Sequence, residues 1–106
     1  MTTPIKIQRL VSQARVPEYA HPGDAGADLF AAADCEILPG KWLAVSTGIA
    51  AEVAIGYELQ VRPRSGLAIK KGVTVLNSPG TIDAGYRGEI KVILVNHSDT
   101  DRKSVV

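Results

Sequence analysis

The chain has 106 residues, an apolar fraction of 45% and a net charge of +1. This length corresponds to one small domain, and the near-neutral charge excludes a broad electrostatic field for nucleic acid or an anionic membrane. Cys35 is the only cysteine, which excludes an internal disulfide and a multi-cysteine zinc site. The N-terminus lacks signal-peptide features, and no apolar run reaches the ~18 residues of a membrane span. We therefore expect a single domain over residues 1–106 in a cytoplasmic protein.

Alternating apolar residues and frequent turns predict short strands along most of the chain. Turn signals recur about every 8–12 residues, and no segment has a sustained helical period, so we expect an all-β sandwich or barrel. Gly48 interrupts one strand and marks a bulge or a close backbone approach. The expected strands are Ile5–Leu10, Trp42–Glu52, Tyr57–Val61, Gly72–Asn77, Thr81–Asp83 and Gly88–Asn96.

Three connections in this pattern carry further expectations. Val16–Gly23 is predicted to be a loop, and Ser65–Lys70 one helical turn with Ser65 as its cap. Ser78-Pro79-Gly80 is predicted to be the turn of a hairpin between Gly72–Asn77 and Thr81–Asp83. Unpaired backbone groups near such a tip can recognise the edge of a base.

Asp28 lies in Ala25–Ala32, a segment of mostly small and apolar residues. In an extended segment its carboxylate faces away from its two neighbours. The structural interpretation is that Asp28 caps a turn or accepts backbone N–H groups. On this segment alone, the structural interpretation is favoured.

Pro63-Arg64-Ser65-Gly66 combines a guanidinium, a hydroxyl and a flexible glycine. Arg64 is suited to bidentate contact with phosphate oxygens, and Ser65 can donate its hydroxyl and its backbone N–H. If Ser65 begins a helical turn, the first N–H groups of that turn point at the same anion. The alternative is a surface arginine in a turn, and the four residues alone are a weak signal.

Thr81–Gly88 places one carboxylate, Asp83, close to an aromatic residue, Tyr86. The structural alternatives are an Asx turn from Asp83 to Gly85 and a core or rim position for Tyr86. A cation, a hydroxyl, a lone acid and an aromatic within two dozen residues favour a site for a small anionic substrate.

These motifs occur together and in order in one known family. Ala25–Ala32, Pro63–Ala68 and Gly80–Val92, with Asn77 before the last, resemble three of the five motifs of the trimeric-type deoxyuridine triphosphatases (dUTPases), in their bacterial form. The resemblance extends from Ile5 to Asn96. Each motif is modest alone, but the set is highly specific.

The resemblance implies a fold, an activity and an assembly. The fold is a distorted jelly roll, and the protein is a homotrimer with its sites between subunits. The activity is hydrolysis of dUTP to dUMP and pyrophosphate with Mg²⁺, which supplies dUMP for thymidylate synthesis and keeps uracil out of DNA. No nucleic-acid or membrane partner is implied.

The resemblance also implies a role for each matching residue. Asp83 is the general base for the attacking water, and the ring of Tyr86 packs on the deoxyribose. Asp28 contacts Mg²⁺ through water, which suits an ion that keeps its hydration shell. The remaining substrate contacts are Arg64, Ser65 and Gly66 to phosphate, Asn77, Thr81, Ile82 and Asp83 to uracil, and Lys91 at a further position.

After Asn96 the sequence departs from the family pattern. The family continues with a fourth motif on further strands and a Gly-rich tail that closes over the phosphates, and neither follows in His97–Val106. We therefore expect a jelly roll that is incomplete at the C-terminus, with weak or no turnover by this chain alone.

Three other interpretations are weighed against this one. A dCTP deaminase-like enzyme requires a catalytic Glu three residues before Asn96, where this chain has Ile93. A non-catalytic nucleotide-binding module needs fewer groups than turnover, but leaves the presence of Asp83 and Tyr86 unexplained. A structural β-domain must treat the whole set of motifs as chance.

Overall fold

The computed structural model describes residues 3–103 and consists mainly of short strands with one helix. Within that range no helix is long and apolar enough to span a membrane. The elements are β1 (Lys6–Arg9), β2 (Glu36–Ile37), β3 (Trp42–Ser46), β4 (Ile49–Glu52), β5 (Leu59–Val61), α1 (Ser65–Lys71), β6 (Val73–Val75), β7 (Gly80–Ile82), β8 (Lys91–Asn96) and β9 (Arg102–Lys103).

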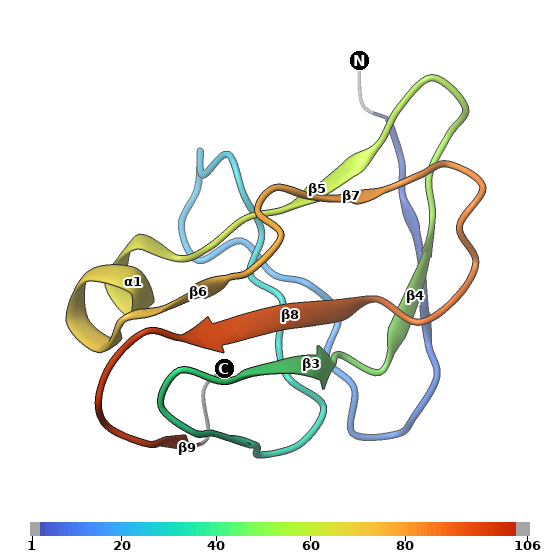
Figure 1. Cartoon of the computed structure of the whole chain (residues 1–106). Helices are drawn as coiled ribbons and strands as arrows, with labels where there is room; N and C mark the ends of the chain where they lie inside the picture. The colour runs from blue at the N-terminus through green and yellow to red at the C-terminus, as the bar shows by residue number, and fades with distance from the viewer. Residues whose placement is uncertain (1–2, 104–106) are drawn as a thin grey trace.

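The strands form four small antiparallel sheets, which confirms the all-β expectation (Figure 1). β8 is the central strand of the largest sheet, between β3 and β6. The other three sheets pair β1 with β4, β2 with β9, and β5 with β7. Each of these three sheets holds only two strands, so packing between sheets must stabilise them.

The side chains of β8 alternate between the two faces of its sheet. Val92 and Leu94 face a cavity of about 530 Å³ between the sheets, together with Ile90 just before the strand. Lys91, on the opposite side, is exposed. The cavity is lined mainly by apolar side chains, because β3, β6 and β8 turn one apolar face toward β5 and β7.

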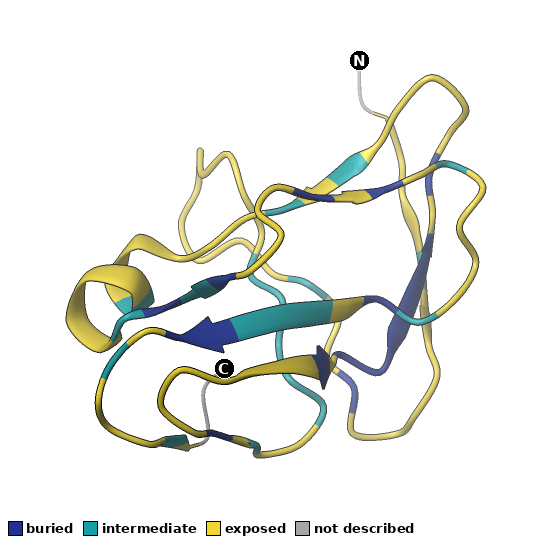
Figure 2. Cartoon of the chain, viewed as in Figure 1, coloured by how far each residue is buried: buried dark blue, intermediate teal, exposed yellow. Residues whose placement is uncertain are grey.

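The core cluster combines residues of β4 and β7 with Ala14 and Ile90, and its three isoleucines also line the cavity. β4 is buried over most of its length (Figure 2). Ile49 and Ile90 are almost fully buried and pack with Ile82. α1 has no buried residue and is exposed at one end of the molecule. Because few residues of the chain are aromatic, aliphatic side chains form this core cluster.

Gly48 joins β3 to β4 at a tight corner. Its φ is +73°, and a Cβ atom there would lie 2.7 Å from Val11 Cγ2 and 2.9 Å from Ala14 Cβ. The Gly48 N–H donates to the Glu89 carboxylate at 2.9 Å. This confirms the expected close backbone approach, and only glycine combines that φ with that lack of space.

The predicted hairpin between Gly72–Asn77 and Thr81–Asp83 is wrong. β6 pairs with β8, whereas β7 pairs with β5. The pairing of β7 with β5 places Ile82 in the core cluster with Leu59 and Val61 packed against it. The turn residues between β6 and β7 therefore carry the chain from one sheet to another, and burial of Ile82 decides the partner.

Three local features also differ from expectation. α1 extends to Lys71, and its N-cap is Arg64, so Ser65 is the first helical residue and caps nothing.

β2 and β9 had no periodic signal, because each has only two residues. They pair through Glu36–Lys103 and Ile37–Arg102. Asn96, fully buried, supports them by donating from Nδ2 to the carbonyls of Ile37 and Thr100, both at 2.8 Å.

The Gly48 corner yields a stability prediction. Gly48→Ala is expected to lower the free energy of unfolding by about 2–4 kcal/mol, because it combines a left-handed φ with overpacking against Val11 and Ala14. Gly56→Ala is the matched control, since Gly56 has φ +94° but no heavy atom within 4 Å of the position that a Cβ would take. It should cost about 1–2 kcal/mol. Urea denaturation measures both, and equal losses would contradict the packing argument.

Candidate functional site

Arg64, Ser65 and Gly66 lie where β5 leads into α1. Arg64 is extended, with φ −90° and ψ 129°, and its side chain is 58% exposed. Ser65 and Gly66 are exposed, and nothing lies within 4 Å of the position of a Cβ on Gly66. Among residues 3–103, the Ser65 hydroxyl has no hydrogen-bond partner. The guanidinium and the hydroxyl are therefore both accessible to an anion.

Asp28 is placed beside this run by a single backbone bridge. Its N–H donates to the Glu18 carbonyl at 2.7 Å, and the Glu18 N–H donates back at 3.2 Å. The Asp28 carboxylate is 31% exposed, and its Oδ1 lies 4.0 Å from Arg64 Nε. The Asp28 side chain thus faces a cation rather than a backbone donor. This differs from the capping role that the sequence favoured for Asp28.

Asp83 and Tyr86 form a turn directly after β7. The Tyr86 N–H donates to the Asp83 carbonyl at 3.1 Å, so the turn closes through the backbone and not through an Asx side chain. The Asp83 carboxylate is exposed and, in the part of the chain that the structure describes, accepts no hydrogen bond. Tyr86 is 46% exposed. A carboxylate with free oxygens beside an accessible ring is compatible with contact to a ligand.

The other predicted contacts lie on or near β7 and β8. Thr81 is exposed opposite Gln60, whereas the Ile82 side chain is buried, so only the backbone of Ile82 is available to a ligand. The Asn77 side chain lies against Gly80, with Nδ2 3.3 Å from the position of a Cβ there. Lys91 is exposed at the start of β8, opposite Ser46.

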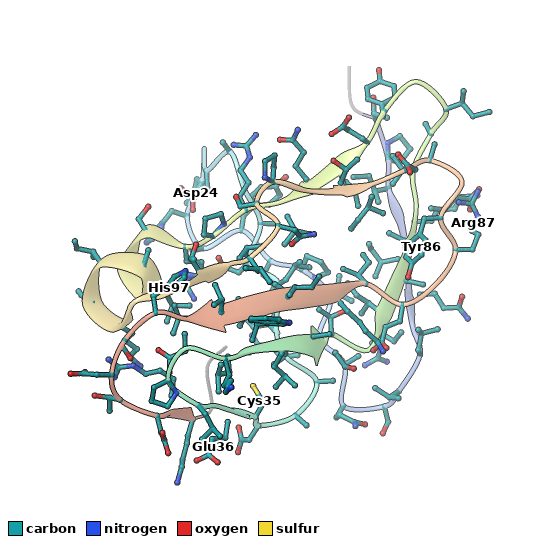
Figure 3. All side chains as sticks on the ribbon, viewed as in Figure 1. Asp24, Cys35, Glu36, Tyr86, Arg87 and His97 are labelled. Carbon is teal, nitrogen blue, oxygen red and sulfur yellow. The ribbon has the colours of Figure 1, made fainter. Side chains whose placement is uncertain are left out.

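The Arg64–Gly66 run and the turn that begins at Asp83 lie at opposite ends of the β5–β7 pair. Leu59 faces Ile82, and Val61 faces Gly80, so the chain leaves the pair toward Arg64 at one end and toward Asp83 at the other. About six residue steps at ~3.3 Å separate them, or about 20 Å. α1 and the labelled Tyr86 accordingly lie on opposite sides of the molecule (Figures 1 and 3). One chain does not gather Arg64 and Asp83 around a single phosphate.

Three residues that the sequence did not single out, Arg87, Gly88 and Glu89, hold the Asp83 turn. The Tyr86 hydroxyl donates to the Glu89 carbonyl at 2.7 Å, and the Glu89 carboxylate accepts the Gly48 N–H. The Tyr86 ring crosses Gly88 so closely that a Cβ on Gly88 would lie 2.7 Å from the hydroxyl oxygen. Arg87 closes the same turn by donating from Nη1 to the Ala84 carbonyl at 2.6 Å. Gly88 and Glu89 lie within the Gly80–Val92 motif, but only the fold shows their contacts.

The cavity between the sheets is not the place where the predicted site residues meet. Arg64 and Asp28 stand at its rim, but Asn77, Asp83 and Tyr86 do not line it. Across residues 3–103, no three His, Cys, Asp or Glu side chains gather in a way that could hold a metal ion. The exposed surface around Arg64 and the exposed surface around Asp83 are therefore separate and do not form one enclosed pocket.

Comparison with known proteins identifies the family. The dUTPase family model matches residues 12–103. The deoxyuridine 5'-triphosphate nucleotidohydrolase of Picosynechococcus is 59% identical over 96 residues, 91% of this chain and 68% of that protein. The enzyme of the same name from Clostridium tetani is 58% identical over 95 residues, 90% and 66% respectively. The chain thus spans about two thirds of the length of these relatives.

Solved structures agree with the sequence relatives. A mutant dUTPase of the Staphylococcus aureus phage phi11, described with a structural Mg(II) ion, has a TM-score of 0.84 and 30% identity over 92% of this chain and 63% of its own. A mutant dUTPase of the Staphylococcus phage 80alpha with dUpNHpp has a TM-score of 0.84 and 31% identity, over 92% and 56%. The jelly-roll-like fold and the resemblance drawn from the motifs are confirmed: the chain belongs to the dUTPase family.

Proposed function

We propose that this chain is a dUTP diphosphatase whose sites form between copies of the chain in a homotrimer. The observation that carries the proposal is the separation of two exposed, chemically complementary surfaces, one around Arg64 and one around Asp83. A second copy that brings its Asp83 turn to the Arg64 surface of the first completes a site, and a threefold ring repeats that contact three times. The predicted cytoplasmic location and the single domain over 1–106 remain expectations.

The Arg64 surface supplies the phosphate contacts. Arg64 is 58% exposed and only loosely paired with Asp28 at 4.0 Å, so little must be broken before it binds an anion. Ser65 adds an accessible hydroxyl, and Gly66 leaves space for close approach. Positioning and charge stabilisation are most of what phosphoryl-group hydrolysis requires, and these residues provide both.

The Asp83 surface supplies the base and the nucleoside contacts. A general base needs a free carboxylate oxygen within reach of the water, and the Asp83 carboxylate is exposed and accepts no hydrogen bond from residues 3–103. Asp83 takes the proton as the water oxygen attacks the α-phosphorus, the bond to the bridging oxygen breaks, and pyrophosphate leaves. Asn77, with the backbone of Thr81 and Ile82, contacts uracil, and Tyr86 packs against the deoxyribose. Lys91 is a further substrate contact.

Mg²⁺ fits this donor set only as an ion that is bound mainly by substrate and water. No cluster of three candidate ligands exists in the range 3–103, but Mg²⁺ on nucleotides commonly uses one or two carboxylates with its waters. The partial exposure of Asp28 beside Arg64 supports it as the carboxylate that would receive such a water. When bound, the ion neutralises phosphate charge.

The proposal is tested by pyrophosphate release from dUTP. The chain alone is expected to release pyrophosphate slowly, from dUTP in preference to dCTP, and Asp83→Asn is expected to reduce that slow rate at least about 100-fold, as for loss of a general base. Asp101→Asn, an exposed aspartate of the C-terminal segment, is the matched control and should retain the rate. Tight binding of a non-hydrolysable dUTP analogue without any hydrolysis of dUTP would instead indicate a binding module.

The shared-site geometry is tested by mixing two inactive variants. Arg64→Ala and Asp83→Asn chains, unfolded and refolded together in equal amounts, should recover about a quarter of the wild-type rate, because each site then draws the two residues from different chains at random. Each variant refolded alone is the control. A mixture no more active than its components would show that Arg64 and Asp83 act from one chain.

The role of Asp28 is tested by titrating Mg²⁺. Asp28→Asn should change the free energy of unfolding by less than about 1 kcal/mol, since the 4.0 Å pair with Arg64 is half-exposed. The same variant should require about tenfold more Mg²⁺ for half-maximal hydrolysis of dUTP. Glu36→Gln, which breaks the similarly exposed pair with Lys103, is the control and should leave the Mg²⁺ requirement unchanged. An unchanged requirement in Asp28→Asn would remove Asp28 from the metal region.

A further inference from the structure

The Tyr86 ring is held from two directions by its own turn. Its hydroxyl donates to the Glu89 carbonyl at 2.7 Å, which fixes the tip of the ring. Beneath it, the Gly88 backbone lies so close that a Cβ would approach the ring to 2.8 Å at Cζ and 3.2 Å at Cε1. Non-bonded carbon atoms prefer about 3.5–4.0 Å, so the ring occupies space that any side chain on Gly88 would take.

The acceptor of the Tyr86 hydroxyl stands on a rigid part of the backbone. The Glu89 carboxylate accepts the Gly48 N–H at 2.9 Å, and the next residue, Ile90, donates its N–H to the Ile49 carbonyl at 2.9 Å. The Ile90 carbonyl accepts the Thr47 hydroxyl at 2.6 Å. Ile90 is 3% exposed. The tether of the ring therefore ends on the buried corner between β3 and β4, and not on a free loop.

We propose that Gly88 is a specificity-determining position: by leaving room for the Tyr86 ring on the Glu89 tether, it sets the discrimination between deoxyribose and ribose nucleotides. The inference rests on the proposed function, in which this ring packs on the sugar. A ring displaced outward by a side chain at Gly88 no longer fits against a deoxyribose. The displaced Tyr86 ring then packs less closely on the sugar, and it excludes a 2′-hydroxyl less strongly. Gly88 acts through Tyr86 and touches no substrate itself.

The test compares two glycines of the same turn. Gly88→Ala introduces the clash, whereas Gly85→Ala is the matched control, because nothing lies within 4 Å of a Cβ there and its φ is outside the left-handed region. The probes are the α,β-imido analogues of dUTP and UTP, with affinity measured by calorimetry. Gly88→Ala should reduce the preference for the deoxy analogue about tenfold. Gly85→Ala should leave that preference within about twofold of wild type.

A double variant and an NMR measurement separate positioning from general damage. Gly88→Ala in a Tyr86→Ala background should cause no further loss of preference, because the two changes act on one ring. Cross-relaxation between the Gly88 Hα protons and the Tyr86 ring should be present in the wild type, and the ring should leave the Glu89 carbonyl in Gly88→Ala. Tyr86→Phe, which adds no atoms, should lose part of the preference by loss of the tether alone.

The outcomes are distinguishable. A folded Gly88→Ala variant with wild-type preference, or with the ring still on its tether, overturns the inference. If Gly88→Ala does not fold, wild-type preference in Tyr86→Phe overturns it. A wild-type chain that binds both analogues equally overturns the proposed function together with the specificity claim, and NMR would then show only that Gly88 positions the ring.

Discussion

One bonded corner supports both the fold and the candidate site. Gly48 donates to the Glu89 carboxylate, and Thr47 donates to the Ile90 carbonyl, so the β3–β4 connection is joined to the start of β8. These polar groups lie in or next to the core, where leaving them unpaired costs about 1–3 kcal/mol each. The corner therefore resists local opening, and the turn that carries Asp83 and Tyr86 is attached to it through Glu89.

Arg64 and Asp83 lie on separate surfaces of one copy of the chain. Each surface is exposed and polar, and its side chains have no strong partners within the described chain. Leaving these side chains unpaired costs little free energy, because both surfaces remain in water. The sheet pair between them, β5–β7, acts as a spacer whose length is set by strand geometry. The chain belongs to the dUTPase family, and its two surfaces, around Arg64 and Asp83, lie about 20 Å apart. Both facts are consistent with sites that are shared between neighbouring copies.

Sequence patterns succeeded where one physical effect dominates. The strands at Lys6–Arg9, Trp42–Ser46 and Lys91–Asn96 lie within three of the segments that the sequence predicts as strands. The patterns failed where two local signals compete. A turn between two strand-like runs predicted a hairpin, but burial of Ile82 against Leu59 decided the pairing. Ser65 has the right chemistry for an N-cap, yet the N-cap is its neighbour Arg64, and Ser65 is already helical.

The sequence by itself determined the family and the fold class, and it predicted which residues carry chemistry, because motif order and residue type are local properties. Only the tertiary structure decided that Asp28 faces Arg64, that Arg64 and Asp83 point to different surfaces, and that Tyr86 is held by Gly88 and Glu89. Each of these depends on which strands pair and in which register. That choice follows from the packing of the whole core, and no short stretch of sequence contains it.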